Sequence, residues 1–399
     1  MRVSSDAPIT YNGVKYRGDI ILTSSGGNSF SIINDINLEE YVKGVLRSEM
    51  PPTWHIEALK AQAILARTYA MSSSGKHNDC DVCATTHCQF YKGINAETPR
   101  VVEAVEATRG MYLAWGSGPA SGLYHADSGG MPASSANVWG RNIDYLRSVP
   151  EPVSYKGTNT TWRTTLSMSY ISSRLNGSGV AVGDISTITP LKRDESGRVL
   201  QIAVKGAAST KTVSGAKYRS ALGADKIKST LFEFRQPRIS YADNTYAPPA
   251  ARPQPASNGG AVKDINNLHG SDQDKLVLMT KNKIFTTAEL MEMLSKPEKS
   301  NYYLKIGMER MKGKNLSLSQ EQTGGSGAAS SASLSNFQLN YSPAQLSNAP
   351  ASGGSITIYG RGFGHGVGLS QWGCKALAES GWDYRQILLY YFPGTSILQ

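Results

Sequence analysis

The stretch NLEEYVKGVLRSEMP, residues 37 to 51, decides the fold of this chain and contains its first candidate functional residue. Asn37 is a good N-cap, and Glu39 and Glu40 suit the first turn of a helix. Apolar side chains recur at helical spacing and predict one buried face, at Leu38, Tyr41, Val42, Val45 and Leu46. Prolines at positions 51 and 52 disfavour helical geometry before them, so the helix is expected to end near Glu49.

Glu49 is therefore expected at the C-terminal end of a helix, where the helix dipole is negative. A carboxylate there has a raised pKa, which suits a general acid that must hold a proton near neutral pH. The alternative is a solvated surface glutamate, which is the commoner fate of this residue type. Motifs further along the chain favour the functional interpretation.

Length and composition restrict the class of protein. The 399 residues are 40% hydrophobic and 18% charged, which is typical of a mostly globular chain with more than one domain. The net charge of +10 favours an anionic partner such as nucleic acid, anionic lipid or an acidic wall polymer. No nucleic-acid-binding motif is present, so nucleic acid is not expected. No apolar run is long enough for a transmembrane helix, and no signal peptide begins at Met1.

The first part of the chain is expected to alternate strands and helices. Strands are predicted at 16–23, 29–33 and 111–115, and helices at 52–73 and 99–108. Short strands and helices alternate from 161 to 232, and a helix at 370–380 with an aromatic segment at 384–392 completes the chain. In the helix at 52–73, Arg67 is either a solvated charge or the buried partner of a carboxylate.

Residues 237–355 differ in composition and are interpreted as an insertion. Residues 246–255 have the composition of a linker, a capping box predicts a short helix at 286–294, and 324–333 contain only glycine, serine and alanine. The expected organisation is a catalytic core at 11–236, the insertion at 237–355 and the C-terminal part of the core at 356–399.

One loop has the composition of a metal site. Three thiols and two imidazoles lie close together in it, at His77, Cys80, Cys83, His87 and Cys88. Zinc takes four such ligands in a tetrahedron, so one zinc ion is expected, with either Cys80 or His77 left over. The alternatives are a redox pair at Cys80 and Cys83, or reduced structural thiols. A fourth protein ligand leaves no open position on the metal, which predicts a structural zinc.

Residues 124–130 read Tyr-His-Ala-Asp-Ser-Gly-Gly, a loop with a hydroxyl, an imidazole and a carboxylate before a glycine pair. Ser128 could be a nucleophile, but the Gly-x-Ser-x-Gly context of a strained elbow is missing. A glycine-rich turn in which the serine caps the backbone is the favoured interpretation.

Glycine occupies every second position from 360 to 368. In an extended strand this pattern leaves one face as bare backbone, which a ligand or another chain segment can approach closely. It is not the dinucleotide-binding fingerprint, because the third glycine and the surrounding βαβ unit are missing. His365, the strongly polar side chain at the centre, is either structural or functional.

Taken together, these motifs resemble the SpoIID/LytB family of bacterial cell-wall proteins. The matching blocks keep the family order: LEEYV to EMP (38–51), EALKAQA to RTYA (57–70), CQFYKG (88–93), YH to SGG (124–130), VWG (138–140) and GFGHGVGLSQWG (362–373). The resemblance implies an α+β fold, a mixed core of helices and antiparallel strands with a long segment inserted before the C-terminal glycine-rich motif.

The resemblance also implies a lytic transglycosylase that cuts peptidoglycan glycan strands, stripped of their peptide stems, between N-acetylmuramic acid and N-acetylglucosamine. The family's catalytic glutamate corresponds to Glu49. Some members bind zinc in the loop that holds Cys83, His87 and Cys88, and their upstream histidine corresponds to His77, with Cys80 competing for that place. The residues expected to bind the sugars are Arg67, Gln89, Tyr91, Tyr124, His125, Ser128, Gly129, Trp139, His365 and Gln371.

The implied chemistry needs one carboxylate, whereas ordinary glycosidases need two. Glu49 protonates the glycosidic oxygen, and the resulting carboxylate takes the proton of the sugar's own C6 hydroxyl. That hydroxyl closes a 1,6-anhydro ring, and the intramolecular attack is fast because both groups are already in place.

Two other functions are open. The LytB side of the family includes enhancers of an N-acetylmuramoyl-L-alanine amidase, and a chain of charge +10 could bind anionic wall polymer without catalysis. A zinc hydrolase is less favoured, because no His-Glu-x-x-His occurs. The expected location is extracytoplasmic, at the cell wall or membrane, with a signal or anchor segment removed.

Overall fold

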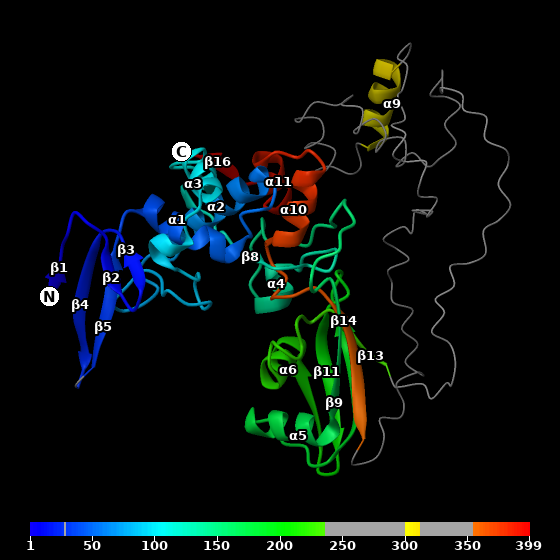
Figure 1. The fold of residues 1–399 in the computed structure, drawn as a ribbon. Coiled ribbons are helices and arrows are strands. Elements are labelled where there is room, and N and C mark those ends of the chain that lie inside the picture. The colour runs from blue at the N-terminus through cyan, green and yellow to red at the C-terminus, as the bar shows by residue number, and fades with distance from the viewer. Residues whose placement is uncertain (28, 236–299, 312–353) are drawn as a thin grey trace. The chain divides into compact units, whose positions relative to one another are not determined.

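A computed structural model describes residues 1–27, 29–235, 300–311 and 354–399 (Figure 1). The chain forms two units, one made of residues 1–237 with 342–399 and the other of residues 238–341. In the second unit the described part is helix α9 (Ser300–Met311). The helix expected at 286–294, the linker at 246–255 and the glycine-rich segment at 324–333 lie outside the described residues.

The N-terminal part of the first unit consists of small antiparallel sheets. Strand β4 (Asp19–Gly26) lies between β1 (Arg2–Val3) and β5 (Ser29–Asp35), and β2 (Ile9–Tyr11) forms a hairpin with β3 (Val14–Tyr16). The two strands expected around the turn at 24–28 are thus confirmed, with β4 starting three residues later than predicted. The left-handed Gly18 separates β3 from β4, because it turns the chain between them.

Helices build the first hydrophobic core, which contains the stretch at 37–51. Helix α1 (Leu38–Glu49) begins where the Asn37 side chain accepts from the Glu39 amide, as the sequence predicted. Helix α2 (Ile56–Ser72) is rich in small residues, which allow α1, α3, α10 and α11 to pack closely on it. The remaining elements here are η1 (Gly93–Ala96), α3 (Pro99–Glu106), β6 (Tyr112–Trp115), β7 (Gly118–Pro119), α10 (Gln371–Glu379), α11 (Tyr384–Tyr391) and β16 (Ser396–Leu398).

Arg67 supports this core from within α2. Its guanidinium is 1% exposed and forms two hydrogen bonds with the Glu39 carboxylate, at 2.8 and 2.6 Å. It also donates to the Met111 carbonyl. Of the two fates predicted for Arg67, the buried partner of a carboxylate is the observed one. Removing either partner would leave a buried charge uncompensated, at a cost of about 3–5 kcal/mol.

A second hydrophobic core lies between residues 161 and 235 and takes one strand from the C-terminal part. Its elements are β9 (Thr161–Ser167), α5 (Met168–Gly177), β10 (Ile185–Arg193), β11 (Val199–Gly206), β12 (Thr210–Ser214), α6 (Gly215–Leu222), β13 (Phe232–Arg235) and β14 (Ser355–Arg361). They form two antiparallel sheets with strand orders β10-β11-β12 and β13-β14-β9. Together the two cores give the expected α+β fold.

The glycine-rich segment after β14 departs from the expected extended strand. The strand ends at Arg361, and Gly362, Gly364, Gly366 and Gly368 all have positive φ, between 75° and 114°. The alternation therefore provides left-handed turns, which residues with a Cβ rarely adopt. The expected close approach of another segment is confirmed, because a Cβ at Gly364 would lie 2.8 Å from that of His125.

Candidate active site

Glu49 is the last residue of α1, and Met50 leaves the helix in an extended conformation. The carboxyl group is half-buried and accepts a hydrogen bond from the Phe90 amide at 3.4 Å. Tyr124 and Gln371 also hydrogen-bond to it. Burial raises the pKa of Glu49, and these three hydrogen bonds partly oppose the shift. The predicted direction is confirmed, but its leading cause is burial rather than the helix dipole.

Two segments far apart in sequence bring Tyr124 and Gln371 to this carboxyl group. Strand β8 (Tyr124–His125) pairs in parallel with β15 (Leu369–Ser370), and Ser370 caps the N-terminus of α10. Gln371 is the first residue of α10, and its amide lies 3.5 Å from the Gln62 oxygen on α2. The loop at 124–130 and the glycine-rich segment therefore form one site with the end of α1.

Gln89 is completely buried and orients the groups around Glu49. Its side-chain oxygen accepts from the Tyr41 hydroxyl at 3.0 Å, and its amide nitrogen donates to the Tyr124 hydroxyl at 3.1 Å. Because Tyr124 accepts from Gln89, its own hydrogen is available for the Glu49 carboxyl group. Gln89, which was expected to contact sugar, thus lies behind Tyr124. The next residue, Phe90, supplies the amide that binds Glu49 directly.

The exposed ring of Trp139 and the partly buried ring of His365 form a pair beside Tyr124. Helix α4 (Ser135–Trp139) presents Trp139, which is 50% exposed and lies 5.3 Å from the His365 ring, centroid to centroid. The His365 ring accepts from the Val367 amide and also hydrogen-bonds to the Tyr124 backbone. Burial lowers the pKa of His365 to about 4, so its ring is neutral at neutral pH.

Several other predicted sugar-binding residues are enclosed by protein. His125 is 4% exposed and its ring contacts the Val367 carbonyl, and Ser128 is fully buried and accepts from the Gly130 amide. The serine therefore caps a glycine-rich turn, as favoured from the sequence. Gly129 has φ +73°, with Leu231 and Arg361 against its α-carbon. The Tyr91 hydroxyl is taken by Asn34 of β5.

A buried polar network supports the 124–130 loop from behind, and the motif analysis did not find it. The Tyr155 hydroxyl lies between the carboxylates of Asp127 and Glu151, at 3.2 and 2.7 Å. Arg198, the residue before β11, donates to the carbonyls of Ser128 and Met131, both at 2.6 Å. Asp127 belongs to the 124–130 motif, but Glu151, Tyr155 and Arg198 come from outside the recognisable motifs, so no local pattern marks them.

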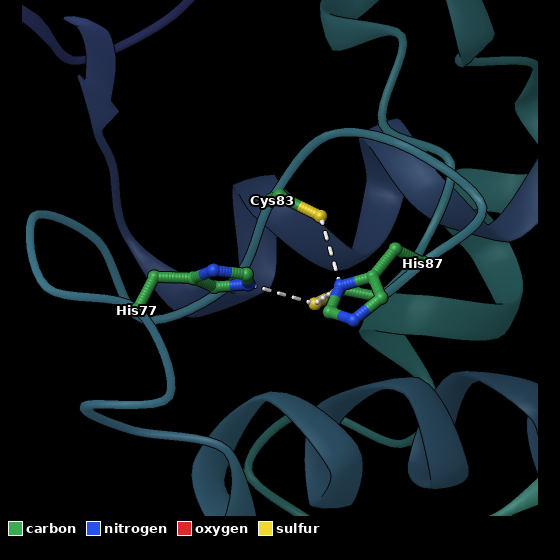
Figure 2. A group of neighbouring side chains, drawn as sticks. His77, Cys83 and His87 are labelled. Carbon is green, nitrogen blue, oxygen red and sulfur yellow. Dashed lines mark hydrogen bonds between the residues drawn. The ribbon is translucent and has the colours of Figure 1, made fainter.

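The metal loop brings four of its five predicted ligands together. Among the described residues, one ligand atom each from His77, Cys83, His87 and Cys88 lies within 4.8 Å of the others, and Cys80 is not part of the group. Figure 2 shows the side chains of His77, Cys83 and His87 turned toward one another. His77 Nε2 lies 3.2 Å from Cys88 Sγ, and Cys83 Sγ lies 3.6 Å from His87 Nδ1.

These separations fit a tetrahedral zinc site. Zinc–nitrogen and zinc–sulfur bonds of about 2.0 and 2.3 Å place tetrahedral ligands roughly 3.3–3.8 Å apart. Burial acts to raise the pKa of Cys83, but hydrogen bonds from Thr85 and His87 outweigh it and lower the pKa to about 6. Cys83 is thus largely thiolate at neutral pH, which is the form that binds metal.

Comparison with known proteins gives two family matches. Residues 26–115 match the family described as "Stage II sporulation protein" (SpoIID), and residues 153–246 match a "Domain of unknown function (DUF8618)". The first match covers α1, α2, the metal loop and α3. The second covers most of the second hydrophobic core.

Similar curated proteins agree with the first match. An uncharacterized protein of Brachyspira hyodysenteriae is 30% identical over 57% of this chain and 61% of its own length. The amidase enhancer of Bacillus subtilis is 25% identical over 89% of this chain and 40% of its own length. Stage II sporulation protein D of Bacillus subtilis is 31% identical over 51% and 62%. The chain therefore spans less than two thirds of the length of these relatives. Among the described helices, none has the length and apolar character needed to cross a bilayer.

Proposed function

We propose that this chain, a member of the SpoIID family, is a peptidoglycan lytic transglycosylase. Family membership and the similarity to stage II sporulation protein D and to an amidase enhancer support a role related to the cell wall. The observation that carries the enzymatic proposal is the half-buried Glu49 carboxyl group, with its raised pKa, among Tyr124, Gln371 and the Phe90 amide.

The arrangement suits a group that first gives and then takes a proton. Burial raises the pKa of Glu49 and so favours the protonated form, which can donate to the bridging oxygen between two sugars. The resulting carboxylate is stabilised by donors already in position, and it can then accept the proton of the C6 hydroxyl. Closure of the 1,6-anhydro ring needs neither a second carboxylate nor an activated water, in contrast to ordinary glycosidases.

The rings of Trp139 and His365 are proposed to hold a sugar beside the acid. The exposed indole of Trp139 offers an apolar face to a pyranose ring. The His365 ring beside it is neutral, so it adds no charge to this apolar surface. Tyr124 and Gln371 both hydrogen-bond to the acid, so they are the residues we expect to touch the reacting sugar.

The zinc is proposed to be structural. His77, Cys83, His87 and Cys88 would fill its coordination sphere, and the ion would fix the conformation of the loop. Cys88 directly precedes Gln89 and Phe90, so the loop conformation determines where the Gln89 side chain and the Phe90 amide lie.

The test is digestion of purified, peptide-free glycan strands without any amidase, with mass spectrometry of the products. The unaltered protein should release chains that end in 1,6-anhydro-muramic acid, and Glu49→Gln should release none. Glu103→Gln, the same chemical change at an exposed position of α3, is the matched control and should be active. Release of anhydro ends by Glu49→Gln would remove Glu49 from the proposed role.

A second candidate function is enhancement of a cell-wall amidase. It is favoured by the similarity to the amidase enhancer, which extends over 89% of this chain. In that case the protein should release no anhydro ends alone but should accelerate peptide release when an N-acetylmuramoyl-L-alanine amidase is added. The same Glu49→Gln variant should then enhance as well as the unaltered protein.

A further inference from the structure

Most of the net positive charge of this protein lies in residues 153–235, the part of the chain that includes the second hydrophobic core. Residues 153–235 contain 13 lysines and arginines against 5 aspartates and glutamates, an excess of 8 in a chain whose net charge is +10. An excess of this size on one module attracts polyanions.

The sheet β10-β11-β12 has one open, polar face. Its opposite face carries buried apolar residues such as Ile188, Ile202 and Val213, which belong to the core that includes α5 and α6. Residues opposite one another in antiparallel strands share a face. The register therefore places five hydroxyl side chains on the open face, at Thr187, Thr189, Thr210, Thr212 and Ser214.

Two lysines and one amide lie on the same face. Lys205 is paired with Thr187 on one side and Thr210 on the other, and Lys192 is paired with Gln201. Both lysines are exposed. Gln201, the partner of Lys192, and Lys205 are four residues apart on β11. The strand positions of the two lysines are therefore about 13 Å apart. The residues that share this face lie in the described part of the chain and include no carboxylate.

A hollow of about 360 Å³ continues this face toward the candidate active site. Lys192 and Gln201 line it from the sheet, and Asn137 lines it from α4. Trp139, two residues further along α4, contacts the ring of His365. The hollow and the ring pair are thus both lined by residues of one short helix, α4.

We infer that the open face of β10-β11-β12, with the hollow beside α4, binds the glycan strand beyond the cleavage point through its free carboxylates. This inference rests on the proposed function. Removal of the peptide stem leaves a carboxylate on each muramic acid, so a stripped strand is a linear polyanion rich in hydroxyl and amide groups. Lys192 and Lys205 would pair with carboxylates, while Gln201 and the threonines hydrogen-bond to the sugars. The nearby carboxylate of Glu195 is engaged by hydrogen bonds from Asn137 and Ser148.

The experiment measures binding without turnover, in the full chain carrying Glu49→Gln. The probe is amidase-stripped glycan from walls freed of phosphate polymers with hydrofluoric acid, and chitin oligosaccharides provide a related backbone without carboxylates. The double variant Lys192→Glu/Lys205→Glu is compared with Lys15→Glu/Lys217→Glu, which changes the net charge equally through exposed lysines of β3 and α6. We expect binding of stripped glycan to weaken about tenfold in the first variant and less than about twofold in the second.

The binding assay separates this inference from the proposed function. Equal weakening in both double variants, equal affinity for chitin oligosaccharides, or binding that disappears once phosphate polymers are removed would each overturn the inference, even if the protein cuts glycan. If binding depends on Lys192 and Lys205 but no anhydro ends are ever released, the binding face is supported and the proposed activity fails.

Discussion

Glu49 is held at the boundary between protein and solvent, and its environment acts on both catalysis and stability. Burial favours the neutral acid, while the Phe90 amide, Tyr124 and Gln371 favour the carboxylate. The balance leaves the pKa of Glu49 raised. A general acid in this state loses its proton, and with it the proposed activity, as the pH rises through the pKa of Glu49 in the folded protein.

Replacing Glu49 by glutamine is expected to remove activity and raise stability. Loss of the acid should lower turnover by about 10²–10⁴-fold. Since the pKa of Glu49 is higher folded than unfolded, ionisation costs folded-state stability above the ordinary glutamate pKa. The melting temperature of Glu49→Gln should therefore exceed that of the unaltered protein at pH 7. The two values should converge as the pH falls below about 4.5. The quantity to compare is the melting temperature of the variant minus that of the unaltered protein. A smaller difference at pH 7 than at pH 4 would contradict this assignment.

Gln89 is expected to act as a positioning residue through Tyr124. Gln89→Met keeps the volume but leaves the hydroxyls of Tyr41 and Tyr124 without their buried partner, which should cost about 1–3 kcal/mol in urea unfolding. Without the donor from Gln89, the Tyr124 hydroxyl is no longer directed at Glu49. The alkaline limb of the pH profile of kcat should therefore shift, whereas a purely structural role would leave it in place. Tyr41→Phe, which removes only the far end of this chain of hydrogen bonds, should have a smaller effect on both measurements.

At the scale of elements, the metal loop presents Gln89 and Phe90 to α1. Metal analysis of the purified protein should find about one zinc per chain. Cys88→Ser should abolish it, and Cys80→Ser, which alters the thiol outside the group, should retain it. Loss of zinc should also speed proteolysis between residues 74 and 90, because structural zinc sites contribute folding free energy directly. Retention of zinc in Cys88→Ser and its loss in Cys80→Ser would require a different ligand set.

The glycine-rich segment packs its backbone against the buried guanidinium that supports the 124–130 loop. A Cβ at Gly366 would lie 2.7 Å from Arg198 Nε, at a residue with φ +87°. Gly130 has φ +111°, but a Cβ there would meet nothing within 4 Å. Both Gly130→Ala and Gly366→Ala should incur backbone strain of about 1–3 kcal/mol. Gly366→Ala should lose a further 1–3 kcal/mol or so from the clash, as measured by urea unfolding. Equal losses would mean that the contact with Arg198 is not tight.

An element could be predicted from the sequence where the residues that determine it lie close together in the chain. Helix α1 was predictable because its cap, its apolar spacing and its terminating prolines all lie within residues 37–52. Helix α4 was not, since five residues are too few to show a helical period. The alternating glycines correctly predicted the close approach of another segment. They wrongly predicted an extended strand, because a pattern of residue types does not report the sign of φ.

The candidate site shows the same division. Glu49, Tyr124 and Gln371 belong to motifs and meet as expected. Gln89 belongs to a motif as well, but only the fold reveals that it faces Tyr124 rather than solvent. Arg198, Tyr155 and Glu151 acquire their roles through contacts between distant segments, so no local signal identifies them.

Across the whole first unit, strand β14 (Ser355–Arg361) joins the two hydrophobic cores. Strand β14 lies between β13 and β9, contributes Ile356 and Ile358 to the second core, and continues into the glycine-rich segment of the candidate site. Correct pairing of β14 therefore positions His365 and Gln371. The second core thus contributes to the site without containing the acid.

The geometry of β13 and β14 predicts that residues 237–354 can be removed without unfolding the rest of the first unit. The two strands are antiparallel neighbours, with Arg235 opposite Thr357, so their adjoining ends can be joined by a short turn. A chain in which residues 237–354 are replaced by an Asn-Gly-containing turn of four residues should therefore keep the fold of the first unit. Its melting temperature should lie within a few degrees of the parent, since shortening a connection costs little and reduces loop-closure entropy. Zinc content and release of anhydro ends should both be retained.

The control joins the strands one residue out of register, which would turn Ile356 and Ile358 away from the core and should prevent folding. If the in-register deletion also fails to fold, residues 237–354 contribute to the stability of the rest of the first unit.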